Sequence, residues 1–194
     1  MIQLNRVLFW LKYKMKKEIF QEIEIPEGVE VNIKGNEVIV KGKEGENRRM
    51  FRIGKIKLEK KDNKIIIGYK NATKNEKKII NTTAAHIKNI IRGVQEKFEY
   101  QLKVCFSHFP ITVKIDGKEV MVKNFLGEKI DRKTKIPEGV DVKVDKDIIT
   151  ISSIDIEKAG EAAANFERVT KIRMRDRRVF QDGIFIIHKA GREM

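Results

Sequence analysis

Val31-Asn32-Ile33-Lys34-Gly35-Asn36-Glu37-Val38-Ile39-Val40-Lys41 is the stretch that decides the fold, because nearly the same pattern returns 82 positions later. Residues 113–123 read Val-Lys-Ile-Asp-Gly-Lys-Glu-Val-Met-Val-Lys. In both copies apolar and polar residues alternate on either side of a glycine-containing turn, which is typical of an antiparallel hairpin. A repeat of this length predicts that one structural unit occurs twice in the chain.

The same shift aligns two helical patterns. The first helix is expected to begin at the capping box Thr73-Lys74-Asn75-Glu76, and the second near Asp155. Each helix carries an apolar stripe, so each should cover one face of its own sheet. The stripes consist of Ile79, Ile80, Ala84, Ile87, Ile90, Ile91 and Val94 in the first helix, and of Ala159, Ala162, Ala163, Phe166, Val169 and Ile172 in the second.

Further alternating runs supply the remaining strands, at about three or four per sheet before each helix. They lie at residues 53–58, 64–69, 140–144 and 148–151. The stretch Ile25–Val31 is also echoed at Ile136–Val142, and both stretches begin with Ile-Pro-Glu-Gly. If this echo set the length of the repeat, too little chain would follow the second copy to complete its domain. We interpret this echo as a shared turn that leads into a strand. The sequence therefore predicts an α+β fold with two tandem duplicated domains, each a small, mostly antiparallel sheet covered by one helix.

The repeat also sets the expected domain boundaries. They are a basic N-terminal extension at residues 1–17, a first α+β repeat at 18–101, and a second repeat with a basic C-terminus at 102–194. The alternating run Phe98–Phe106 leads from one repeat to the next, and the shift places Phe98 on Phe180. Within the extension, the apolar run Val7–Leu11 is too short for a membrane span, which needs about 20 apolar residues.

Charge indicates the kind of partner. The 194 residues include 42 Lys and Arg against 28 Asp and Glu, which leaves a net charge of +14. An excess of this size favours a polyanionic partner, and without a spanning segment nucleic acid is preferred over a membrane. The lone Cys105 cannot form an internal disulfide and is expected as a strand thiol in a protein of the reducing cytoplasm.

Catalytic and metal-binding motifs are missing from the sequence. His86, His108 and His188 lie far apart, so a zinc site is not expected. There is no glycine-rich phosphate loop with its lysine, no serine elbow and no His-Glu metal pair. Gly42–Gly45 resembles a phosphate loop superficially but is interpreted as a hairpin loop. We therefore expect no enzyme activity, no cofactor and no small-molecule substrate.

The densest positive charge follows the second helix, in residues 168–183, where arginine outnumbers lysine. Arginine grips phosphate oxygens with a planar fork, so this bias favours RNA contact over a merely solvated charged loop. Asp176 is interpreted as an internal partner of an arginine, and Asp182-Gly183 as a turn before a buried strand at 184–187. His188–Arg192 is expected to leave that strand as a basic tail. No aromatic base-stacking platform is evident.

Four ordered motifs resemble the family of large-subunit ribosomal protein six in its archaeal form, whose eukaryotic counterpart is numbered nine. They are Ile25–Val29, Ala85–Val94, Ser107–Ile111 and Arg178–Ile186, and the resemblance spans residues 18–192. It implies a non-enzymatic protein that binds large-subunit rRNA near the sarcin–ricin loop, beside the ribosomal proteins at the base of the factor-binding stalk. Phe185 stands where the family often has tyrosine.

The resemblance also implies that the second domain holds most of the RNA and that the first lies nearer the periphery. Together with the basic segment and tail, it predicts an RNA site. That site consists of Lys171, Arg173, Arg175, Arg177, Arg178, Phe180, Asp182, Gly183, Lys189 and Arg192. A free-standing RNA-binding or assembly factor with the same fold is the alternative, because it would need the same basic surface.

Overall fold

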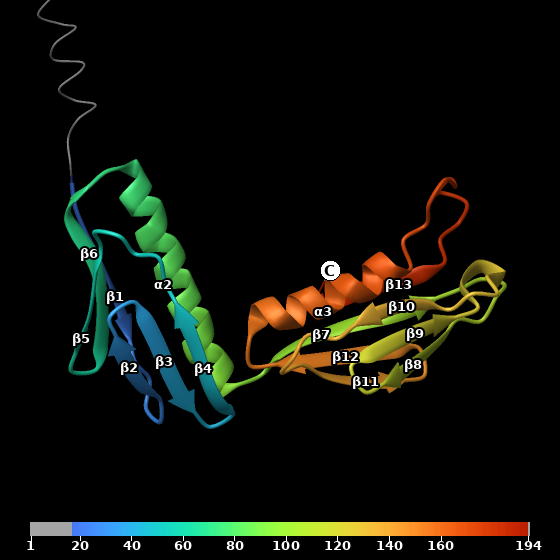
Figure 1. Cartoon of the computed structure of the whole chain (residues 1–194), viewed down its shortest axis with the longest axis horizontal. Coiled ribbons are helices and arrows are strands. Elements are labelled where there is room, and N and C mark those ends of the chain that lie inside the picture. The colour runs from blue at the N-terminus through green and yellow to red at the C-terminus, as the bar shows by residue number, and fades with distance from the viewer. Residues whose placement is uncertain (1–16, 194) are drawn as a thin grey trace, which may run out of the picture. The chain divides into compact units, whose positions relative to one another are not determined.

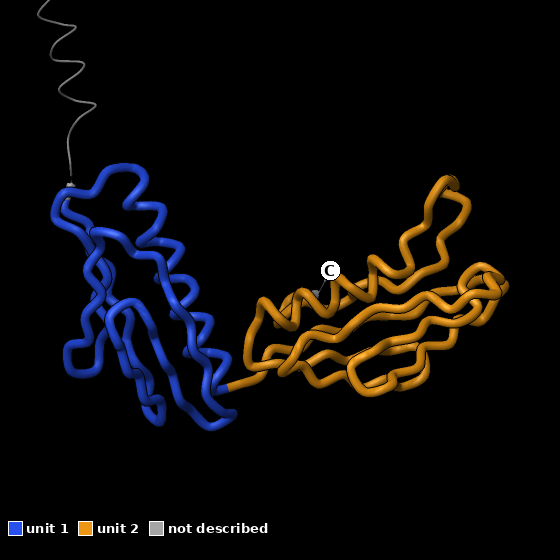
Figure 2. The backbone as a smooth tube through the Cα atoms, viewed as in Figure 1, with its two compact units in different colours: residues 1–95 blue, residues 96–194 orange. Residues whose placement is uncertain are grey.

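A computed structural model of the chain describes residues 17–193, so nearly all of the predicted extension lies outside the described residues. The chain divides into two compact units after Gln95 (Figure 2). Each unit contains antiparallel sheets and one long helix (Figure 1). The fold is therefore the predicted duplicated α+β arrangement.

The first unit holds two three-stranded antiparallel sheets, in the orders β1-β6-β5 and β2-β3-β4. Helix α2 packs against strands of both sheets, namely β1, β6, β3 and β4. The alternation of the sequence puts Val38, Val40, Ile65 and Ile67 into the core, fully covered by the apolar face of the helix. The elements are β1 (Lys17–Glu24), β2 (Glu30–Lys34), β3 (Glu37–Gly42), β4 (Gly45–Met50), β5 (Lys57–Lys61), β6 (Lys64–Ala72) and α2 (Lys74–Gln95).

Both ends of α2 are fixed by polar contacts. At the start, the Asn75 N–H donates to the Thr73 hydroxyl at 3.3 Å and the Thr73 N–H to the Glu76 carboxylate at 2.9 Å, as the capping box predicts. At the end, the Val94 carbonyl accepts from the Glu44 N–H at 2.9 Å. A Cβ on Gly42 would lie 2.8 Å from that carbonyl oxygen, so the β3–β4 hairpin needs glycine there. The Gly42–Gly45 segment is thus a hairpin loop, as expected.

The second unit repeats this plan and extends it. A three-stranded sheet has the order β10-β9-β8, and a five-stranded sheet the order β11-β12-β7-β13-β14. Helix α3 packs on β7, β10, β12 and β13, and its first turn is capped by the Asp155 carboxylate, which accepts from the Glu157 N–H at 2.9 Å. The elements are β7 (Phe98–Cys105), β8 (Thr112–Asp116), β9 (Glu119–Lys123), η1 (Phe125–Gly127), β10 (Arg132–Lys135), β11 (Asp141–Asp145), β12 (Ile148–Ser153), α3 (Ile156–Val169), β13 (Gly183–Lys189) and β14 (Arg192–Glu193).

The 82-residue repeat relates β2–β3 to β8–β9 and α2 to α3. The pairing of β1 with β6 in the first unit returns as the pairing of β7 with β12 in the second. Strand β7 is therefore the counterpart of β1, and the units divide after Gln95, where the sequence had suggested 101/102. The predicted match of Phe98 with Phe180 is wrong for the same reason: Phe98 starts β7, whereas Phe180 lies in a loop after α3.

Local expectations differ from the structure in a few places. Residues 53–58 are mostly not a strand, because a turn at Gly54 interrupts the alternation and β5 begins only at Lys57. Each unit has two sheets rather than one. The alternation did not predict β4 and β10, because these strands are rich in charged residues and carry little apolar signal. Ile79 is 38% exposed, and Ile172 lies beyond the end of α3 although it still packs against the core.

The Ile-Pro-Glu-Gly echo is explained by the strands that follow it. Its first copy leads into β2 and its second into β11, which are not counterparts in the repeat. Gly28 and Gly139 have nearly the same left-handed backbone, with φ of 81° and 82°. The echo is a shared local turn, and glycine is required there because side chains disfavour positive φ.

Candidate nucleic-acid interface

The predicted arginine-rich segment is a loop, residues 170–182, between α3 and β13 (Figure 1). Among the described residues of the first unit, neither this loop nor β13 has a counterpart, because α2 is followed at once by the next unit. Its side chains Arg173, Arg175, Arg177 and Arg178 are all exposed. The second unit therefore carries its cluster of arginines on an element that the duplication did not supply.

Thr170 fixes the start of the loop. Its side chain is buried, at 3% exposure, and its hydroxyl lies 3.3 Å from the Glu167 carbonyl, to which it can donate. The same oxygen accepts from the Ile184 N–H at 3.0 Å, which joins the end of α3 to the first residues of β13. A buried hydroxyl that both donates and accepts a hydrogen bond is strongly held, because breaking either bond would leave a buried polar group without a partner.

Arg132 of β10 fixes the same region from the other sheet. Its guanidinium donates to the Val169 carbonyl at 2.9 Å and to the Lys171 carbonyl at 3.2 Å. It also forms a two-point bridge to Glu128, at 2.6 and 2.7 Å, and lies 4.3 Å from the centre of the Phe125 ring. These hydrogen bonds hold the pKa of Glu128 below its ordinary value, and the charges of Arg132 and Arg175 act in the same direction.

A turn at Asp176 shapes the middle of the loop. The Asp176 carboxylate accepts from the Arg178 N–H at 2.9 Å, and its carbonyl accepts from the Phe180 N–H at 3.0 Å. Asp176 is thus a partner of Arg178, as predicted, but through the backbone amide rather than the guanidinium. Arg175 stacks on Phe180, with 4.8 Å between the guanidinium carbon and the ring centre.

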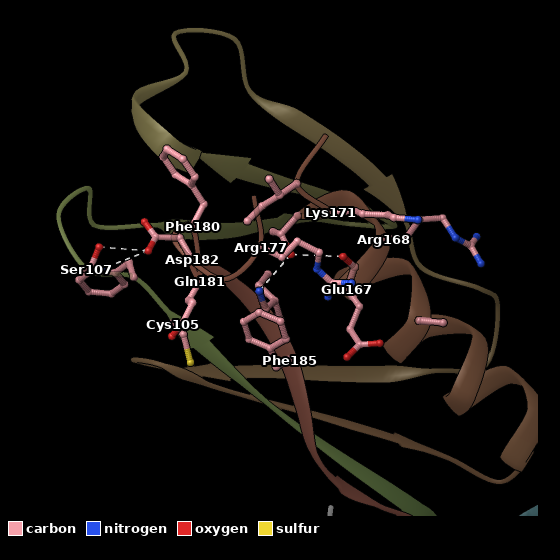
Figure 3. Close-up of a pocket in the computed structure, with 15 residues that line it drawn as sticks. Cys105, Ser107, Glu167, Arg168, Lys171, Arg177, Phe180, Gln181, Asp182 and Phe185 are labelled. Atoms are coloured by element: carbon pink, nitrogen blue, oxygen red, sulfur yellow. Dashed lines mark hydrogen bonds between the residues drawn. The ribbon is translucent and has the colours of Figure 1, made fainter. Parts of the chain in front are cut away.

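Asp182 fixes the end of the loop. Its side chain is buried, at 6% exposure, and its carboxylate accepts from both the N–H and the hydroxyl of Ser107 (Figure 3). Gly183 is also buried, and a Cβ there would meet the Phe185 ring at 3.2 Å. Both residues were predicted in the RNA site. The structure places them beneath the loop, where they position its backbone.

The structure brings most of the predicted residues together but separates two of them. Lys171 and the loop arginines with Phe180 form one cluster. Lys189 lies at the far end of β13, about 20 Å along the strand from Gly183 at roughly 3.3 Å per residue. Arg192 is in β14, which pairs back on β13, so the expected basic tail is a tight hairpin. Its Ala190 N–H is held by the Glu99 carbonyl at 2.9 Å.

A pocket of about 860 Å³ opens beside the loop (Figure 3). Its walls come from the end of β7, the last turn of α3, the loop and the start of β13. Three phenylalanines and three cations share the lining: Phe106, Phe180, Phe185, Arg168, Lys171 and Arg177. The sequence did not predict this pocket, because Phe106 is far in the chain from Phe180 and Phe185. It also missed Arg132, whose charge looks like that of any surface cation.

Two other features are absent from the part of the chain that the structure describes. Residues 17–193 contain no group of three or more His, Cys, Asp or Glu side chains that could hold a metal ion. None of the helices among these residues is long and apolar enough to cross a membrane.

The exposed arginine-rich loop gives the second unit the kind of basic surface that nucleic-acid-binding scaffold proteins use. The chain matches the family described as ribosomal protein L6 over residues 25–97 and again over 109–183, one match in each unit. It belongs to the ribosomal protein L6 family.

Similar proteins in archaea carry the name large ribosomal subunit protein uL6. The one from Methanobrevibacter smithii is 46% identical over 171 residues, which cover 88% of this chain and 96% of that protein. The one from Sulfurisphaera tokodaii is 44% identical over 172 residues, with 88% and 92% covered. The one from Methanosarcina mazei is 42% identical over 176 residues, with 91% and 100% covered. The similarity therefore extends through both units.

Proposed function

We propose that this chain is a structural constituent of the large ribosomal subunit and that its second unit binds large-subunit rRNA near the sarcin–ricin loop and the base of the factor-binding stalk. Membership of the ribosomal protein L6 family supports the ribosomal role, makes the chain a non-enzymatic protein of translation, and gives it a cytoplasmic location on the ribosome. Its partners are rRNA and the neighbouring ribosomal proteins at the stalk base.

The observation that supports the RNA site is the fixed backbone of the loop 170–182. Its backbone is held by Thr170, Arg132, Asp176 and Asp182 through hydrogen bonds. Its arginine side chains point into solvent, and within residues 17–193 none of Arg173, Arg177 and Arg178 forms an ion pair. A fixed backbone with unpaired cations loses little conformational entropy on binding phosphates, so it is pre-organised for RNA.

The members of the predicted site divide into two roles. Lys171, Arg173, Arg175, Arg177 and Arg178 contact RNA phosphates, with Phe180 beneath Arg175 as its support. Asp182 and Gly183 act from below by fixing the loop. Lys189 and Arg192 form a second, separate contact at the other end of β13.

The test uses directed hydroxyl-radical cleavage. An iron chelate is attached to Val179→Cys in a Cys105→Ala background, since Val179 is 74% exposed on the loop. We expect cleavage of rRNA close to the sarcin–ricin loop and the stalk base after reconstitution with large subunits. The matched control is Lys74→Cys on the exposed start of α2, from which cleavage should be sparse.

Cleavage elsewhere from position 179, or equal cleavage from both positions, would contradict the proposed site. Co-sedimentation after a high-salt wash distinguishes the ribosomal protein from the assembly-factor alternative. A subunit constituent remains with the large subunit, whereas a factor held by surface charge is released.

A further inference from the structure

Three phenylalanine side chains line the pocket beside the loop. Phe106 is 41% exposed and Phe185 38% exposed, and both open onto the same hollow as the half-buried Phe180. Single exposed apolar side chains are ordinary on proteins. Several that face one concavity mark a ligand site. The three rings come from the end of β7, the loop and β13, and Figure 3 shows Phe180 and Phe185 on either side of Gln181.

Positive charge lines the same hollow. Lys171 and Arg177 are exposed, and within residues 17–193 neither forms an ion pair. The carboxylates of the lining already have partners: Glu167 accepts from the Ile186 N–H at 3.2 Å, and Asp182 from Ser107 at 3.1 Å. The cations are therefore available to an outside anion. Flat apolar faces beside such cations suit an aromatic base that bears a phosphate.

Gln181 adds a group that can read the edge of a base. Its side-chain nitrogen donates to the Arg178 carbonyl at 3.1 Å, which holds the amide in place. The amide oxygen accepts no hydrogen bond from the described residues. A fixed acceptor at the rim of an aromatic pocket can receive the amino group of a base.

We propose that this pocket binds one unstacked nucleotide of the rRNA, with its base against Phe185 and its phosphate on Arg177 and Lys171. The inference rests on the proposed RNA-binding function and adds base recognition to it. Proteins recognise RNA sequence mainly through bases that are splayed out of the helix and stacked on aromatic rings. Arg173, Arg175 and Arg178 lie on the same loop outside the pocket lining, where they hold the phosphates on either side. A free nucleotide lacks these flanking phosphates.

The experiment compares two substitutions at Phe185. Phe185→Leu keeps an apolar side chain but removes the ring, and Phe185→Tyr keeps the ring. The probe is a transcript of Methanobrevibacter smithii large-subunit rRNA that spans the sarcin–ricin loop and the stalk base. Dissociation constants are measured over a series of salt concentrations. Phe106→Leu serves as a second pocket variant, and Phe20→Leu, 46% exposed in the first unit, as the control.

Loss of one base–aromatic stack weakens binding by roughly 5- to 150-fold. We expect Phe185→Leu to show a loss in this range with an unchanged salt slope, because no phosphate contact is removed. Phe185→Tyr and Phe20→Leu should bind like the parent. Ultraviolet cross-linking of the parent complex should join RNA to a peptide that contains Phe106, Phe180 or Phe185. Circular dichroism verifies that each variant is folded.

The outcomes separate this inference from the proposed function. If the parent binds with a steep salt dependence but Phe185→Leu and Phe106→Leu bind equally well, the base pocket is refuted and the RNA-binding function stands. If the parent does not bind the transcript, both are refuted. A mixture of the four nucleoside monophosphates, at millimolar concentration, tests whether the pocket binds free nucleotides instead of a nucleotide of the rRNA. Thermal stabilisation of the parent by this mixture, with RNA binding insensitive to Phe185→Leu, would show a free-nucleotide site instead.

Discussion

The Asp182 carboxylate receives two hydrogen bonds from Ser107, one from the backbone N–H at 3.1 Å and one from the hydroxyl at 3.2 Å. Ser107 lies two residues after the end of β7, and Asp182 directly precedes β13, which pairs with β7. The contact therefore closes the end of the sheet at which the basic loop rejoins it.

The first prediction concerns this contact. Asp182→Ala should lower the free energy of unfolding of the second unit by about 1–3 kcal/mol, because the Ser107 donors lose a buried acceptor. Asp182→Asn keeps an oxygen at the same place and should cost less. Denaturant unfolding gives the free energies, and hydrogen exchange at the Ser107 amide should accelerate only in the alanine variant. Equal losses in the two variants would show that the acceptor is unimportant.

The second prediction separates a specific site from general basicity. Two variants each replace four cations with glutamine. One removes Arg173, Arg175, Arg177 and Arg178, and the other removes Lys74, Lys77, Lys78 and Lys88, which are exposed on α2. Each lost phosphate contact lowers the salt slope of binding by roughly 0.9. The arginine variant should therefore show a clearly flatter slope and poor incorporation into large subunits, and the lysine variant should stay close to the parent.

Filter binding to rRNA over a series of salt concentrations measures both slopes. Lysines of β5 are less suitable as controls, because the Lys60 ammonium donates to the Val31 carbonyl at 3.1 Å and its loss would disturb the first unit. Equal weakening by the two sets would mean that binding is diffuse, and the assignment of the loop would be wrong.

The third prediction tests the two cores separately. Ile87 of α2 and Ala163 of α3 are fully buried on the inner faces of these helices. Ile87→Asp and Ala163→Asp each place an unpaired carboxylate there, which costs about 3 kcal/mol or more. Each should unfold its own unit, as amide exchange can resolve. Lys88→Asp, on the exposed face of α2, is the control and should leave both units folded. Val169 is only half-buried, so Val169→Asp should be milder.

The fourth prediction concerns pH. Arg132 lowers the pKa of Glu128 in the folded protein below the ordinary 4.5, so the folded state favours the ionised carboxylate. The resulting stability is present above the ordinary pKa and is lost as the pH falls through the lower folded value. Glu128→Gln should be less stable than the parent at neutral pH, and the difference should vanish in strong acid. Urea unfolding at a series of pH values measures this. Because the Glu128 side chain is 40% exposed, added salt should shrink the difference.

Much of the fold follows from residues that alternate or recur. The Val31–Lys41 hairpin, the capping box at Thr73 and the cap at Asp155 all appear in the structure at their predicted places. The boundary between the units was harder to predict, because β7 alternates equally well as the last strand of one unit or the first of the next. Its pairing with β12 and β13 decides the matter, and pairing partners are not encoded locally.

The basic loop was visible as a cluster of arginines, but the groups that shape it were not. Arg132 reaches the carbonyls of residues 169 and 171 from another sheet, and Ser107 reaches Asp182 across 75 residues of sequence. Thr170 looks like any threonine at the end of a helix. Such contacts depend on the tertiary arrangement, so composition and periodicity cannot reveal them.

Strand β13 pairs with one edge of β7, and the described residues of the first unit contain no equivalent strand beside β1. Within residues 17–193, no strand pairs with the outer edge of β1. An open edge of this kind invites backbone pairing with a second copy, which is a route to aggregation. Strand β1 carries Glu18, Glu22 and Glu24, whose like charges oppose such stacking between copies. Before assembly into a particle, the acidic residues of β1 therefore limit self-association at this edge.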